Sequence, residues 1–185
     1  MSTIATAQVI HGLSAVAVDH LLVGCYWPSI AQVLLAQGFS WPALADLVAM
    51  DGDDDSALEV KLKELHDQVD RDLDTAPRLE PWNVVAGIYG RAWRMDLIDP
   101  TSAMWRMDSL WWQVRDLDDD EENDGIRLIW AGMGVKEQDD GELPWQAVDR
   151  LGVEVLTEAD LLLPPRALDH SLCKAIRDAL EANGY

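Results

Sequence analysis

The chain has 185 residues, of which 49% are apolar, and it carries 34 acidic side chains against 14 basic ones, a net charge of −20. That many apolar residues can fill the core of a globular protein, which excludes a disordered acidic tail. The shortage of basic residues excludes direct binding to nucleic acid or to an anionic membrane, because phosphate groups are bound by a basic surface.

Residues 1–50 form a helical part that is almost without charge. Asp19 is the one charged residue among the first 45. A segment of this composition must be buried, either in the protein's own core or against a partner. Apolar residues recur at helical spacing, and Pro28 and Pro42 suit first helical turns. The predicted helices are 13–24, 28–37 and 41–49.

The acidic part, residues 51–185, begins with a turn and a helix. Ser56 and Glu59 have the spacing of a capping box, in which each side chain satisfies a free backbone N–H group. The residues that follow place leucine and valine on one stripe and charged residues opposite. The members of that stripe are Leu58, Leu62, Leu65, Val69 and Leu73. The pattern predicts a helix that ends before Pro77.

Short apolar runs in the rest of the chain predict a small β element. Ile126–Trp130 and Val153–Leu156 are rich in β-branched and aromatic residues and are interpreted as strands, whereas 82–93 fits either a strand or a buried helix. Further helices are predicted over 102–117, 157–163 and 166–182. The predicted fold class is therefore mainly α with a small β element (α+β), in which amphipathic helices surround the core of one compact domain, residues 1–185.

The sequence predicts a cytoplasmic protein with reduced cysteines. Cys25 and Cys173 are far apart in the chain and do not form a disulfide framework, so both are expected to be buried thiols. No basic residue precedes Lys61, and a secretory signal needs a basic segment before its apolar one. The longest apolar stretch near the N-terminus, residues 13–26, is too short to cross a membrane.

Motifs of catalysis and of metal binding do not fit this chain. Asp120, Glu122 and Asp124 resemble the start of a calcium loop, but Ala131 stands where the bidentate glutamate is needed. The run from Asp51 to Asp55 departs from the calcium-loop pattern sooner, because Ser56 stands where the loop needs a glycine. The four histidines, His11, His20, His66 and His170, form no metal-ligand pattern. The sequence therefore predicts no catalytic residue, no cofactor and no metal site.

Tryptophan provides the most specific indication of a binding surface. On a helical wheel of residues 102–117 the apolar residues occupy one broad face, while Trp105 and Trp112 lie together on the opposite face beside Asp108. Tryptophan is common at binding hot spots because it brings a large rigid surface and an N–H donor. The alternative is that this helix is buried on both sides.

An acidic stretch follows that helix directly. Residues 116–124 hold seven acids and no base, and like charges at this density repel one another unless a cationic partner relieves the repulsion. The usual interpretation of such a stretch is a solvated loop. Its position next to the tryptophan helix favours a binding function instead. The predicted partner-binding residues are Trp105, Trp112, Asp108, Asp116, Asp118, Asp119, Asp120, Glu121 and Glu122.

These features predict a non-enzymatic protein that inhibits or neutralises a basic partner protein, such as a nucleic-acid-binding protein or a toxin. In size and charge the chain is of the same physical type as nucleic-acid mimics, anti-restriction or anti-CRISPR inhibitors and immunity proteins. One alternative is an adaptor that forms homo-oligomers through the apolar helices of residues 1–50. A small hydrolase with a site assembled from scattered residues is the other.

Overall fold

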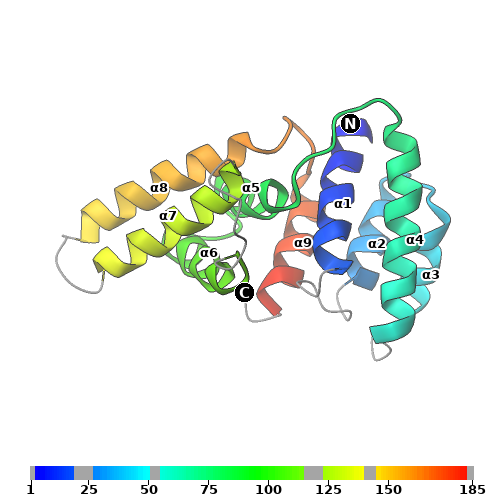
Figure 1. The fold of residues 1–185 in the computed structure, drawn as a ribbon, viewed down its shortest axis with the longest axis horizontal. Coiled ribbons are helices and arrows are strands. Elements are labelled where there is room, and N and C mark those ends of the chain that lie inside the picture. Colours follow the sequence, from blue (N-terminus) through cyan, green and yellow to red (C-terminus); the bar gives the residue numbers. More distant parts are fainter. Residues whose placement is uncertain (1–2, 19–26, 51–54, 115–122, 140–144, 183–185) are drawn as a thin grey trace. The chain divides into compact units, whose positions relative to one another are not determined.

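The computed structural model describes residues 3–18, 27–50, 55–114, 123–139 and 145–182, and within these ranges all regular secondary structure is helical (Figure 1). The helices are α1 (Thr3–Val18), α2 (Trp27–Ala36), α3 (Pro42–Ala49), α4 (Asp55–Leu73), α5 (Pro81–Arg94), α6 (Pro100–Val114), α7 (Asp124–Asp139), α8 (Trp145–Leu161) and α9 (His170–Ala182). No helix among the described residues is long and apolar enough to cross a membrane.

The predicted β element is wrong. Ile126–Trp130 lies in α7, Val153–Leu156 lies in α8, and 82–93 forms α5, the helical alternative of the two. In α7 the exposed residues Arg127 and Trp130 are three apart, which is the spacing of a helix and not of a strand. Short apolar runs do not distinguish a buried helix from a strand, and packing overrides the β propensity of valine and isoleucine here.

The described residues divide into two compact units. Unit 1 comprises Met1–Pro81 and Pro164–Asn183, and unit 2 comprises Trp82–Leu163. Unit 1 therefore contains α1 to α4 and α9, while α5 to α8 belong to unit 2. Whether both units fold as the one domain of residues 1–185 that the sequence predicts stays a prediction.

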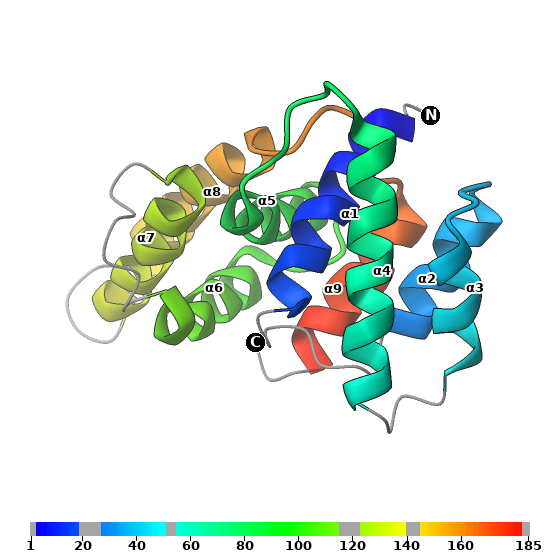
Figure 2. The ribbon, with the colours of Figure 1, turned by 45° about the vertical axis from the view of Figure 1, so that its right-hand side comes forward.

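Unit 1 buries most of the apolar residues of the charge-poor segment. α1 packs against α4, α4 against α3, and α2 against both α3 and α9. In two different views α1 and α4 run side by side (Figures 1 and 2). The core includes Ile10, Leu13, Ile30, Leu34, Leu44 and Leu47, all with no exposed surface. α1 begins ten residues before the predicted helix, since Val9, Ile10 and Leu13 already belong to its buried face.

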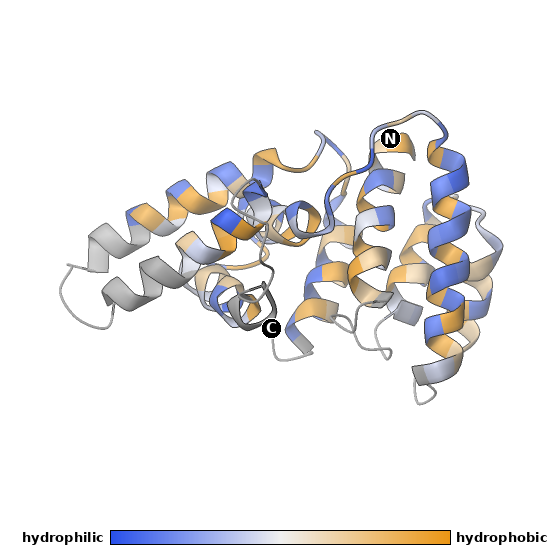
Figure 3. Cartoon of the chain, in the orientation of Figure 1, coloured by the Kyte–Doolittle hydropathy of each residue, from blue (hydrophilic) through white to orange (hydrophobic). Residues whose placement is uncertain are grey.

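The helix predicted from the leucine stripe is confirmed as α4, and the predicted helix 166–182 is confirmed as α9, which begins at His170; residues 19–24 of the predicted helix 13–24 lie outside the described residues. Every member of the α4 stripe, from Leu58 to Leu73, is at most 4% exposed. Hydrophilic residues are prominent along α4, whereas α1 is mostly hydrophobic (Figure 3). Asp169 precedes α9, and its Oδ1 accepts a hydrogen bond of 2.9 Å from the Leu172 backbone N–H. Cys173 of α9 is buried, and Cys25 lies outside the described residues.

Unit 2 is built from four helices, two of which have well-defined polar caps. Asp99 accepts hydrogen bonds from the Ser102 hydroxyl (2.6 Å) and backbone N–H (2.9 Å) at the start of α6, and these bonds lower the pKa of its carboxyl group. Asn123 accepts from the Gly125 backbone N–H (3.0 Å) at the start of α7. α7 packs against both α6 and α8, and α6 also contacts α8.

One face of α5 is shaped for a close contact with α8. Gly87, Gly90, Arg91 and Arg94 are spaced so that they share this face. A side-chain carbon at Gly90 would lie 2.6 Å from the Leu156 carbonyl oxygen, so only glycine allows the two backbones to approach this closely.

A buried ion pair lies beside this contact. Arg91 and Arg94 both bind the carboxylate of Asp160, which is 3% exposed, and Arg91 is also buried, whereas the Arg94 side chain is 66% exposed. Arg91 also donates at 3.4 Å to the carbonyl oxygen of Leu163. A carboxylate that leaves water needs such partners to offset its lost hydration.

We expect Asp160→Asn to destabilise unit 2 by about 3–5 kcal/mol, because it leaves the Arg91 charge buried without the carboxylate that neutralises it. Arg94→Ala is the matched control, since an exposed partner of the same carboxylate contributes about 1 kcal/mol or less. Urea denaturation followed by circular dichroism measures both changes. Equal losses in the two variants would contradict a dominant role for the buried pair.

Candidate functional site

Trp105 lies exposed on α6, as the helical wheel predicts. Its side chain is among the largest exposed apolar groups of the described residues, with 48% of its surface accessible. The opposite face of the same helix is buried and consists of Ala103, Met104, Met107 and Leu110, none more than 4% exposed. Trp105 is therefore not part of the core of unit 2, and about half of its surface is accessible.

The structure describes few of the other predicted binding residues. Asp108 lies one turn after Trp105 on α6 and is partly buried. Trp112 belongs to α6, but its side chain lies outside the described set. The remaining members, Asp116, Asp118, Asp119, Asp120, Glu121 and Glu122, also lie outside the described residues. Their role in binding stays a prediction.

A second exposed tryptophan, Trp130 of α7, was missed by the sequence analysis. Its side chain is 47% exposed, and α7 packs directly against α6. The signal that could have identified it is the helical spacing of its buried neighbours Ile126 and Ile129, which leaves Trp130 on the solvent side. Interpretation of this run as a strand concealed that spacing. Among the side chains that the structure describes, these two packed helices of unit 2 each carry an exposed tryptophan.

The chain between these two helices is the acidic stretch. α6 ends at Val114 and α7 begins at Asp124, so the acids from Asp116 to Glu122 connect the two helices that carry Trp105 and Trp130. Asp124 is exposed at the N-terminus of α7, where a negative charge is favourable to the helix dipole. In sequence, the acidic stretch thus joins the two helices that carry the exposed tryptophans.

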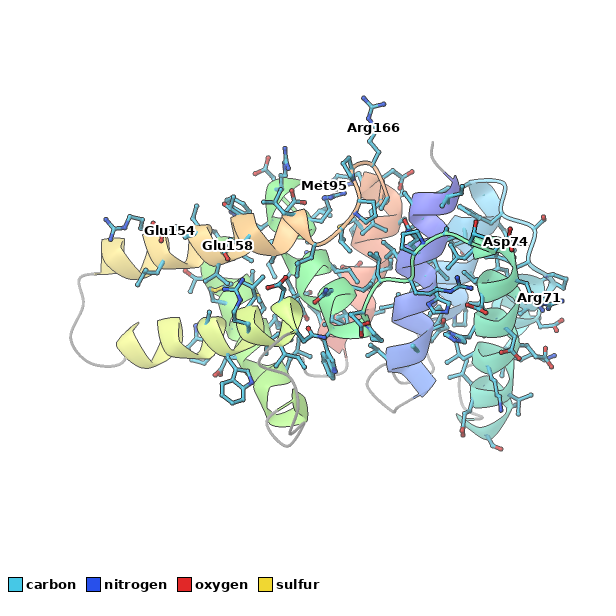
Figure 4. The ribbon with its side chains drawn as sticks, turned by 45° about the horizontal axis from the view of Figure 1, so that its top comes forward. Arg71, Asp74, Met95, Glu154, Glu158 and Arg166 are labelled. Atoms are coloured by element: carbon cyan, nitrogen blue, oxygen red, sulfur yellow. The ribbon has the colours of Figure 1, made fainter. Side chains whose placement is uncertain are left out.

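Ion pairs hold the outer acids of the neighbouring helix. Glu158 of α8 lies 3.3 Å from Arg127 of α7, which also approaches Asp124 at 3.4 Å. Glu154, one turn earlier on α8, pairs with Arg150 at 3.8 Å. Figure 4 labels both glutamates along α8. Exposed pairs of this kind contribute little to stability, although each of them offsets the charge of an acid in unit 2.

Unit 1 contains a polar cluster that the sequence analysis did not find. His11 and Ser14 of α1 meet His66 and Asp70 of α4: the His11 Nε2 lies 3.2 Å from Asp70 Oδ1, and the Ser14 Oγ lies 3.0 Å from His66 Nδ1. The histidine rings are in contact, with centroids 4.2 Å apart. No local sequence signal joins residues that are 52 or more positions apart, so the cluster depends on the packing of α1 against α4.

The chemistry of this cluster is structural and not nucleophilic. Ser14 has no exposed surface, and its hydroxyl also lies 2.9 Å from the His11 carbonyl oxygen, so a substrate has no access to it. Arg78 holds the pKa of the Asp70 carboxyl group below its usual range through a hydrogen bond.

In the part of the chain that the structure describes, no group of three or more His, Cys, Asp or Glu side chains is arranged to hold a metal ion. The two acidic runs that were compared with calcium loops lie largely outside the described ranges, which omit Asp51 to Asp54, Asp120 and Glu122.

Comparisons of the chain with protein-family models, with curated proteins and with solved structures found no match.

Proposed function

We propose that this protein is a non-enzymatic acidic binding protein of the cytoplasm that inhibits or neutralises a basic partner protein. The observation that supports the proposal most strongly is Trp105, which is 48% exposed on the helix that leads directly into the acidic stretch. The partner is a protein with a cationic surface, of the kind that normally receives nucleic acid or another polyanion.

The aromatic residues supply the part of the surface that gives affinity. Exposed tryptophan rings on packed helices, Trp105 on α6 and Trp130 on α7, can be desolvated by a partner without unfolding unit 2. Aromatic anchors near the centre of an interface contribute most of its binding energy. The contribution of α6 to the core of unit 2 comes from its buried face and not from Trp105.

The acids supply the part that gives speed and selectivity. With a net charge of −20 the protein attracts a cationic partner over a distance of about a Debye length, roughly 8–10 Å at physiological salt. Many basic side chains of the described residues are already in ion pairs within their own unit, among them Lys61, Arg78, Arg127 and Lys174. The remaining acidic field resembles that of nucleic-acid mimics and immunity proteins in physical type.

The alternative, an adaptor that forms homo-oligomers through residues 1–50, has less support. The helices of that segment direct their large apolar residues into the core of unit 1, where Ile10, Leu13 and Leu34 have no exposed surface. Among its described residues the large exposed apolar side chains are Ile4, Leu35 and Val48, which are on three different helices. Because Ile10, Leu13 and Leu34 are already buried in the core of unit 1, they do not need a second copy of the chain to cover them.

We expect Trp105→Ala to weaken binding of the partner while leaving the protein folded. The wild-type protein, immobilised and exposed to a lysate of its native host, should retain a basic protein that mass spectrometry identifies. Removal of an anchor of this kind weakens binding by about 2 kcal/mol or more, close to thirtyfold in Kd, chiefly through faster dissociation.

Leu161→Ala is the matched control for this experiment. Leu161 is a large apolar residue on α8 of the same unit and is 73% exposed, so its loss removes exposed apolar surface from a helix other than α6 and α7. The control should bind as the wild type does. A Kd and dissociation rate of Trp105→Ala equal to those of the wild type, or capture of acidic proteins only, would contradict the proposed function.

Neutralising Asp118, Asp119 and Asp120 together to asparagine should slow association with the captured partner and flatten the dependence of its rate on salt. Dissociation should change little, because exposed charges act mainly on the encounter. Surface plasmon resonance at several salt concentrations measures both rates.

A triple variant with the same net charge, at two residues of α4 and one in the turn that follows it, provides the comparison. Glu59→Gln, Asp67→Asn and Asp74→Asn remove three exposed acids of unit 1. An equal slowing in both triple variants would show that only the total charge matters and would refute a specific role for the acidic stretch.

A further inference from the structure

A polar seam crosses the contact between α1 and α4 in unit 1. The amide of Gln8 donates to the Pro77 carbonyl oxygen at 2.7 Å, His11 meets Asp70, and Ser14 meets His66. Residue numbers rise along α1 while those of the partners fall, so the two helices are antiparallel. The seam lies among the apolar residues through which these helices pack.

Within the seam, His11 is the histidine whose surroundings most disfavour a positive charge. Its side chain is 13% exposed, and its ring lies against that of His66 with the centroids 4.2 Å apart and the planes inclined by 32°. Two imidazoles at this distance cannot both be protonated without strong repulsion.

The hydrogen bonds assign one neutral form to His11. Its Nε2 faces the Asp70 carboxylate and therefore carries the proton, which leaves Nδ1 as a bare acceptor. Among the described residues this Nδ1 is buried and has no hydrogen-bond partner. Protonation of His11 would place a buried N–H donor where no acceptor meets it, and an unsatisfied donor of this kind is costly.

The surrounding charges do not offset that cost. The titratable and charged groups that act on His11 are His66 and Asp70 of α4 and Arg78 beyond its C-terminus. Asp70 favours the protonated ring, but its carboxylate is already bound by Arg78 at 2.8 Å. Burial, followed by the effect of His66, lowers the pKa of His11 below 6.5.

We propose that the α1–α4 contact of unit 1 is an acid-sensitive latch, closed while His11 is neutral and loosened when mild acid protonates it. A lowered pKa in the closed state means that the open state binds the proton more readily. The latch therefore has its full stability above about pH 6.5 and loses it as the pH falls further. This device is independent of the identity of the partner.

The test compares urea unfolding of the wild type with that of His11→Gln at pH 7.5 and pH 5.5. The unfolding equilibrium constant of the wild type should rise relative to that of the variant by up to about tenfold, the limit set by the titration of an ordinary imidazole in the unfolded chain over this range. His170→Gln is the control, since it removes an exposed histidine from α9, and it should follow the wild type. Parallel pH profiles for wild type and His11→Gln would overturn the proposal.

Hydrogen exchange of the wild-type protein gives a second test that does not depend on the folding of any variant. After correction for the intrinsic effect of pH, backbone amides of α1 should lose protection between pH 7.5 and 5.5, while those of Met104 and Met107 in α6 should keep theirs. Unchanged protection in α1, or the same loss in both helices, would refute a latch at His11.

Discussion

A chain with 34 acids and 14 bases can form a core only if almost all of its carboxylates stay in water. This constraint explains the distribution of residues along the sequence. The charge-poor segment supplies much of the core of unit 1, and the acids of α4 stand on the side away from its buried stripe. Among the described residues Asp160 is the one buried acid, and two arginines meet it.

The same constraint places a large negative charge on the surface of the protein. Local ion pairs occupy many of the basic residues, and segment 116–122 has no base of its own. The cationic partner that we propose would relieve self-repulsion of this kind, and the exposed rings of Trp105 and Trp130 lie on the helices at either end of that segment. Charge and aromatic surface thus both favour unit 2 as the proposed binding unit. The His11 cluster has a different role, because it is enclosed between two helices of unit 1.

The sequence predicted those features that depend on local periodicity. The leucine stripe of α4 and the wheel of α6 located a buried face correctly, and the latter also located the exposed Trp105. The strands predicted at Ile126–Trp130 and Val153–Leu156 were wrong because a short apolar run carries no reliable period, and the Asn123 cap that starts α7 was not recognised. The contacts of His11 with α4 and of Arg91 with Asp160 join distant segments, so periodicity along the chain could not predict them.

Hydrogen exchange of the protein with and without its captured basic partner tests the central claim most directly. The account predicts that binding protects amides of α6, of residues 115–122 and of the first turns of α7, and leaves α1 to α4 unchanged. Protection confined to α1, α2 and α3, or protection by a second copy of the chain in the absence of any partner, would contradict it and favour the oligomeric adaptor.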